Sequence, residues 1–192
     1  MSRTLYLFAC GAGHASELAT LVNLAREDGW DVYVGTTPAG WDFIEPAELA
    51  DLTGHDVRRD YSGRTSGWPA ADAIIVAPAT INTIDKFAAG IADCWALSVL
   101  IECMGHGVPI IFAPNVNPAL GRHPRFRQNL EDLQNWGLSV LWDDPAPDAP
   151  SWMAPWSAII KELQACTSGH IEDRPSPPET KCGRSTSSRP GL

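Results

Sequence analysis

A glycine-rich turn near the N-terminus has the composition of a phosphate-binding loop. It follows an apolar run at residues 4–10 and precedes a stretch with helical periodicity over 15–28. Small residues let backbone N–H groups approach a phosphate, and a helix start adds donors. The residues we expect to contribute are Gly11, Ala12, Gly13 and Ser16. The spacing is not that of a dinucleotide fingerprint, and a plain tight turn explains it equally well.

Two later turns carry neutral hydrogen-bonding side chains. The segment 78–84 reads Pro-Ala-Thr-Ile-Asn-Thr-Ile and follows an apolar run. Thr80 is a candidate N-cap for the next helix, but capping does not account for Asn82 and Thr83 in the same turn. The segment 114–120 contains Asn117 before a proline, a pattern that also occurs in plain loops. Both turns offer hydroxyl or amide groups at the end of a strand.

These turns follow apolar runs that we interpret as buried strands. Strands are predicted at residues 4–10, 31–35, 72–77, 108–112 and 138–142, with Pro78 ending the third. Helices are predicted over about 15–28, after 36–38, from Thr80, and over about 93–104, 124–135 and 156–165. Strands that are apolar throughout are buried on both faces, which indicates a parallel sheet between helices. We therefore predict a single-domain, three-layer α/β fold, a doubly wound parallel sheet of the Rossmann or flavodoxin-like type. Such sheets bind ligands beyond the carboxyl ends of their strands.

The composition favours one globular domain that binds neither nucleic acid nor membrane. The chain has 192 residues, 44% of them hydrophobic, and a formal net charge of -9 without a lysine or arginine cluster. No apolar run approaches the ~20 residues of a membrane helix, and the N-terminus lacks a secretory signal, so we predict a cytoplasmic protein. We predict a folded domain at 1–166 and a disordered tail at 167–192, which is rich in Ser, Pro, Gly and charge.

The cysteines do not form a metal-binding pattern. There are five, and their spacing fits no zinc motif. Cys10, Cys94 and Cys103 lie in apolar segments, where buried reduced thiols are expected. We predict no metal site.

Two motifs together resemble one protein family. Residues 78–93, PATINTIDKFAAGIAD, resemble the PASANTI…K-x-A-x-G-x-x-D signature of the homo-oligomeric flavin-containing cysteine decarboxylases. Residues 114–121, PNVNPALG, resemble that family's second signature, P-x-M-N-x-x-M-W. The proline and asparagine match, both methionines are other aliphatics, and Gly121 stands at the tryptophan position. The resemblance covers about residues 4–142.

The resemblance implies an FMN enzyme assembled as a homo-oligomer, a trimer or dodecamer, with FMN bound between subunits. It implies a phosphate site at Ala12, Gly13 and Thr37, and flavin contacts from Pro78, Ala79, Thr80, Asn82 and Thr83. It also implies that Asn117 holds the substrate carboxylate. In this family a cysteine with a free carboxylate is oxidised at Cβ to a thioaldehyde, CO₂ leaves, and an enethiol remains. The implied substrate is a small molecule or a peptide with a C-terminal cysteine.

Outside the two signatures, the chain departs from the family in two further places. The catalytic histidine of the decarboxylases lies fourteen residues before the first signature proline, and here that position is Arg64. Arginine stays protonated and cannot act as a base, so Arg64 either holds an anion or is a surface residue. His123 is a histidine that could approach the site. Residues 143–155 also lack the flap cysteine of the phosphopantothenoylcysteine decarboxylases.

These features favour FMN-dependent oxidative decarboxylation of a thiol-carboxylate, such as a peptide C-terminal cysteine. The alternatives are a phosphopantothenoylcysteine decarboxylase-like enzyme, a prenyl-FMN synthase-like enzyme, and a flavin-binding partner subunit with altered catalysis.

Overall fold

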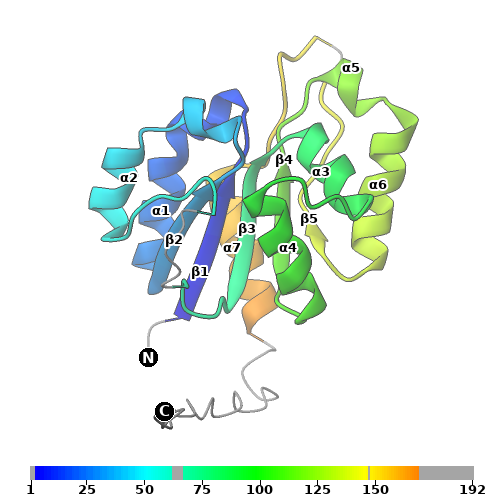
Figure 1. Cartoon of the computed structure of the whole chain (residues 1–192). Helices are drawn as coiled ribbons and strands as arrows, with labels where there is room; N and C mark the ends of the chain where they lie inside the picture. Colours follow the sequence, from blue (N-terminus) through cyan, green and yellow to red (C-terminus); the bar gives the residue numbers. More distant parts are fainter. Residues whose placement is uncertain (1–2, 62–66, 147, 169–192) are drawn as a thin grey trace, which may run out of the picture.

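A parallel five-stranded sheet forms the centre of the computed structural model, which describes residues 3–61, 67–146 and 148–168. Its strands are β1 (Arg3–Ala9), β2 (Trp30–Thr36), β3 (Ala73–Ala79), β4 (Ile110–Pro114) and β5 (Ser139–Val140). The strand order is β2-β1-β3-β4-β5, and every neighbouring pair is parallel (Figure 1). The predicted doubly wound α/β fold is confirmed.

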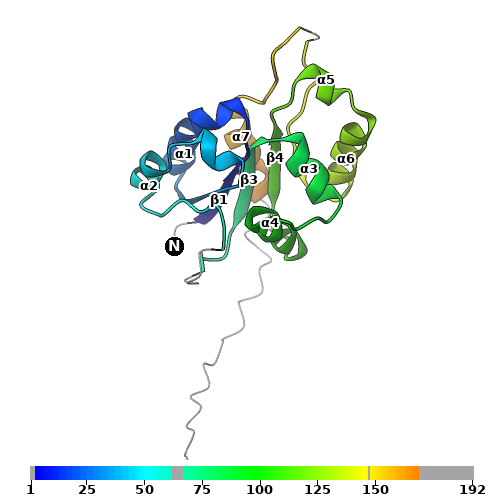
Figure 2. The same ribbon diagram turned by 45° about the horizontal axis from the view of Figure 1, so that its top comes forward.

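Helices cover both faces of the sheet. One face packs against α1 (Leu18–Glu27), α2 (Pro46–Thr53) and α7 (Trp156–Thr167). The other packs against α3 (Ile81–Ala88), α4 (Trp95–Gly105) and α6 (Pro124–Asn135). In Figures 1 and 2, α4 lies in front of the sheet and α7 behind it, which gives three layers.

The central strands are apolar throughout because each of their faces contributes to a different core. Along β1, Leu5 and Leu7 belong to the core beneath α1 and α7, whereas Tyr6 and Phe8 belong to the core beneath α4. Leu5, Leu7 and Phe8 are fully buried. Each side chain of this size stabilises the fold by roughly 1.5–3 kcal/mol on burial, so the sheet is a rigid base for the loops at its edge.

Most strand and helix ends lie within two residues of the sequence prediction, and three elements differ in other ways. Pro78 lies inside β3 and does not end it, because the pairing of β3 with β4 shifts register between Val76 and Ala79, where a ladder donor is not needed. The predicted helix over 15–28 begins as a 3₁₀ turn, η1 (Gly13–Glu17), before α1. The predicted strand over 138–142 pairs only at Ser139–Val140.

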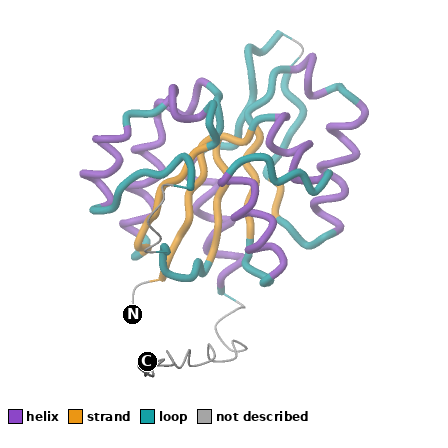
Figure 3. Tube along the Cα trace, in the orientation of Figure 1, coloured by secondary structure: helices purple, strands orange, loops and turns teal. Residues whose placement is uncertain are grey.

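The carboxyl ends of the strands meet at one edge, shown at the top of Figure 3. There η1, η2 (Gly40–Phe43), the start of α3 and the short α5 (Pro118–Gly121) follow β1, β2, β3 and β4 in turn. Among the described ranges, no helix has the length and apolar character needed to cross a bilayer.

Candidate functional site

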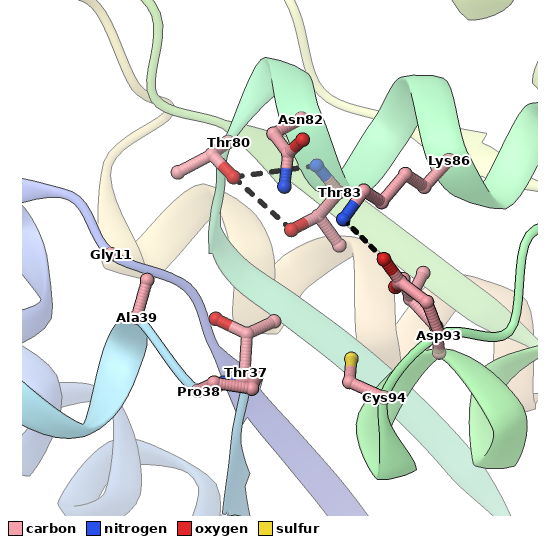
Figure 4. A pocket seen from close by; sticks show the side chains of 11 residues that line it. Gly11, Thr37, Pro38, Ala39, Thr80, Asn82, Thr83, Lys86, Asp93 and Cys94 are labelled. Atoms are coloured by element: carbon pink, nitrogen blue, oxygen red, sulfur yellow. Dashed lines mark hydrogen bonds and ion pairs between the residues drawn. The ribbon is translucent and has the colours of Figure 1, made fainter.

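A cavity of about 470 Å³ opens at the carboxyl ends of β1, β2 and β3. This volume is within the usual range for small-molecule sites. Side chains of α3 and of the turn after β2 face each other across it (Figure 4). The lining residues are Gly11, Thr37, Pro38, Ala39, Thr80, Asn82, Thr83, Lys86, Asp93, Cys94 and Leu97.

The turns after β1 and β2 form one wall of the cavity and touch through backbone. The Thr37 N–H donates to the Ala9 carbonyl at 3.1 Å, and the Gly40 N–H donates to the Thr37 carbonyl at 2.9 Å. A Cβ atom on Gly11 would come within 3.0 Å of the Ala39 carbonyl oxygen, and one on Gly40 would overlap the Ala9 carbonyl oxygen. Glycine is required at position 40 because the two turns approach so closely, and a larger residue at position 11 would push Ala39 outward.

The opposite wall is the first turn of α3, which is both a helix cap and a source of polar groups. The Thr80 hydroxyl accepts from the Thr83 N–H at 3.4 Å and lies 3.1 Å from the Thr83 hydroxyl. Thr80 is therefore the N-cap of α3, as the sequence suggested. The cap does not remove these hydroxyls from the cavity, since both residues line it together with Asn82.

The third wall contains the charged members of the lining. The Lys86 ammonium group donates to the Asp93 carboxylate at 2.6 Å, joining the last turn of α3 to the segment before α4. Cys94, beside this pair, packs half-buried against the core and also lines the cavity. It is not fully buried as predicted, because it precedes α4 at the cavity edge. Lys86 and Asp93 were not predicted as site residues, although both match the first signature.

Several predicted cofactor residues stabilise the turns around the cavity and do not line it. Ala12 precedes η1, and the Ser16 hydroxyl donates to the Gly13 carbonyl at 3.0 Å. The Pro78 carbonyl accepts from the Cys10 N–H at 3.0 Å, and the Ala79 carbonyl accepts from the Asn115 N–H at 2.8 Å. The cavity wall thus contains Gly11, Thr37, Thr80, Asn82 and Thr83 of the predicted set.

Two of the predicted catalytic residues, Asn117 and His123, lie outside the cavity lining. Asn117 is exposed at the start of α5, where its Oδ1 accepts from the Leu120 N–H at 2.9 Å. His123 is exposed at the start of α6, where its Nδ1 accepts from the Arg125 N–H at 3.2 Å. Both are N-caps at the same edge of the sheet as the cavity. Arg64 lies outside the described residues.

Burial keeps the thiol beneath the cavity neutral. Desolvation raises the pKa of the Cys10 thiol, partly offset by hydrogen bonding to Thr83 and Thr80. Cys10 is therefore a protonated structural residue under the α3 turn. Over the ranges that the structure describes, no cluster of His, Cys, Asp and Glu side chains could hold a metal ion.

The sequence of this chain is similar to those of known flavoproteins and of coenzyme A biosynthesis proteins. The family model described as Flavoprotein matches residues 1–168. The bifunctional coenzyme A biosynthesis protein CoaBC of Thermococcus kodakarensis is 30% identical over 130 residues, which are 62% of this chain and 32% of the relative. CoaBC of Escherichia coli K12 is 29% identical over 157 residues, 78% of this chain and 37% of the relative. The chain thus spans about a third of the length of these curated relatives.

Solved structures share the fold at lower sequence identity. The FMN-dependent cysteine decarboxylase SpaF aligns with a TM-score of 0.71 and 24% identity, covering 88% of this chain and 98% of that one. A variant of PPC decarboxylase in complex with pantothenoylaminoethenethiol aligns with a TM-score of 0.72 and 19% identity, covering 88% of this chain and 100% of that one.

Proposed function

Because the chain belongs to the Flavoprotein family, we propose that it binds FMN in the cavity at the carboxyl ends of β1, β2 and β3. We further propose that it catalyses the oxidative decarboxylation of a thiol-carboxylate, such as the C-terminal cysteine of a peptide. The observation that carries the proposal is the set of hydroxyl and amide groups of α3 that faces the close-packed turns after β1 and β2.

The residues present fit FMN in size and in chemistry. Gly11 and Thr37 lie in turns with little side-chain bulk, which suits a phosphate held by backbone and hydroxyl donors. Thr80, Asn82 and Thr83 offer neutral donors and acceptors, as the polar edge of a flavin requires. Lys86 adds one positive charge, which the Asp93 carboxylate balances at 2.6 Å in the same lining. When bound, FMN supplies the two-electron oxidation that side chains cannot perform.

The protein's own contribution would be to hold and orient the substrate. In our proposal Asn117 binds the substrate carboxylate through its amide N–H groups, because its carbonyl oxygen is already used to cap α5. A neutral donor suits a group that must leave as CO₂, because a buried ion pair would stabilise the carboxylate more strongly. His123 and Arg64 stay candidate groups for proton or anion binding in this proposal.

Two measurements on the purified full chain test this function. Bound oxidised flavin should give absorbance bands at ~370 and ~450 nm. Incubation with a peptide ending in cysteine should then lower the peptide mass by roughly 46 Da, the mass of CO₂ plus two hydrogens. A protein that is colourless and takes up no added FMN would contradict both parts of the proposal, whereas a yellow protein without the mass loss would contradict the reaction alone.

The CoaBC relatives favour a second candidate substrate, a phosphopantothenoylated cysteine. The sequence argues against the redox-neutral version of this reaction, since residues 143–155 contain no cysteine. Offering both substrates to the same sample separates the candidates. Faster turnover of the phosphopantothenoyl compound would replace the peptide as the proposed substrate.

A further inference from the structure

A tryptophan ring occupies the space next to Gly121, where the second signature has its tryptophan. A Cβ atom on Gly121 would lie 3.0 Å and 3.2 Å from two carbons of the Trp142 ring. Gly121 is buried and ends α5, and Trp142 follows the short strand β5. No larger side chain fits at position 121 while the Trp142 ring stays in place.

The Trp142 ring also contacts the residues that fix the segment before α5. It packs edge-to-face on Phe126 of α6, with ring centroids 5.4 Å apart, and on Trp152, also at 5.4 Å. Phe126 is fully buried. Aromatic pairs in this geometry stabilise their neighbours beyond the area that they bury.

Trp152 connects this packing to the backbone of the second signature. Its N–H donates to the Val116 carbonyl at 3.2 Å, and the Val116 N–H donates back to the Trp152 carbonyl at 3.3 Å. The Asn115 side-chain amide donates to the same Trp152 carbonyl at 3.3 Å. Trp142 is therefore connected to both residues that precede Asn117.

We infer that Trp142 is a positioning residue for the segment 115–121, and that its ring replaces the tryptophan side chain that the second signature places at position 121. We call Gly121 and Trp142 an exchanged pair. Glycine is needed at position 121 because the Trp142 ring, which comes from another part of the chain, fills the space that a tryptophan side chain at position 121 would take. The role in substrate binding rests on the proposed function of Asn117, but the positioning role does not.

Hydrogen exchange on the full chain tests the positioning role without a substrate. In Trp142→Ala, we expect the amides of Val116, Leu120 and Gly121 to exchange about tenfold faster or more, while those of β1 and β3 keep their wild-type rates. Trp142→Phe should restore most of the protection. Trp136→Ala, which removes an exposed tryptophan at the end of α6, is the matched control and should leave the segment unchanged. If amide exchange became faster to the same extent throughout the protein, or did not become faster at residues 115–121, the inference would be overturned.

The exchange of the pair is tested by a double substitution. Gly121→Trp alone should lower Tm by several degrees, because the new side chain meets the Trp142 ring. Gly121→Trp combined with Trp142→Ala should recover at least about half of the sum of the two single losses. Losses of Tm that simply add, or a double variant that does not fold, would contradict the exchange.

Where wild type decarboxylates the peptide, Trp142→Ala should also raise KM with little change in kcat or in FMN affinity. An inactive wild type would count against the proposed function alone, and the exchange rates would still decide the positioning role.

Discussion

Gly40 offers the sharpest test of how the cavity wall is built. Its backbone lies against the end of β1, so an added Cβ would overlap the Ala9 carbonyl oxygen and lie 3.2 Å from the Cys10 carbonyl carbon. Both partners are backbone atoms at the carboxyl end of β1, which is paired on both sides in the sheet, so they cannot move aside. Gly40→Ala must therefore displace the turn after β2, which strains the hydrogen bond from the Thr37 N–H to the Ala9 carbonyl.

The expected cost follows from these two contacts. Overpacking typically costs about 1–3 kcal/mol, and a net hydrogen bond adds about 1 kcal/mol. A total of about 3 kcal/mol corresponds to a loss of roughly 9 °C in Tm for a chain of this size. Because Thr37 lines the cavity, FMN affinity should fall about tenfold or more.

Differential scanning calorimetry and flavin fluorescence titration measure the two quantities. Gly13→Ala is the control for stability, because a Cβ there meets nothing within 4 Å, and its Tm should stay close to that of wild type. Gly54→Ala is the control for binding. Gly54 ends α2 with φ of 76°, so alanine should cost about 1 kcal/mol without changing FMN affinity. If Gly40→Ala has the same Tm as Gly13→Ala, the two turns do not pack as closely as described here, and the cavity wall that we assign to FMN is refuted.

Three further results are expected. Asn117→Asp keeps the capping oxygen but replaces the amide donors by a negative charge, so peptide affinity in calorimetry should fall at least about tenfold while flavin content is unchanged. Lys86→Gln should weaken FMN binding roughly fivefold in titration. Asp93→Asn frees Lys86 and removes a negative charge, so it should leave FMN affinity unchanged or higher. If both substitutions weaken FMN binding, the charge argument is refuted. Burial raises the pKa of the Tyr6 hydroxyl to about 12, so its neutral form contributes stability below pH 10 that is lost as pH rises toward 12. In urea unfolding at pH 8 and pH 11, Tyr6→Phe should show a smaller pH dependence than wild type.

The sequence predicts the sheet and much of the cavity because both depend on local patterns. Apolar runs identify all five strands, and parallel strands bring their carboxyl ends to one edge. The turns that carry Gly11, Thr37 and Thr80 therefore had to meet. Gly11 and Thr80 follow from fold class and turn chemistry, whereas Thr37 was named only through the family resemblance.

Other features depend on tertiary contacts that no local pattern contains. Pro78 fits within β3 only because the register to β4 shifts beside it. Cys94 has an apolar neighbourhood in sequence, yet the start of α4 places it in the cavity lining. Gly121 could be seen as a departure from the signature, but only the fold shows that the Trp142 ring occupies that space.

The helix caps at the carboxyl edge determine which atoms are left for a ligand. At α3 the Thr80 hydroxyl is engaged with the Thr83 N–H and hydroxyl, so the threonines present neutral oxygens of fixed orientation to the cavity. At α5 the cap takes the acceptor of Asn117 and leaves its amide N–H groups. A group that can only donate is suited to a carboxylate and not to a cation. In the sequence, capping competed with binding as an explanation of Thr80, and a plain loop competed with binding at Asn117. In the structure both residues are caps, and capping sets the polarity with which they would bind.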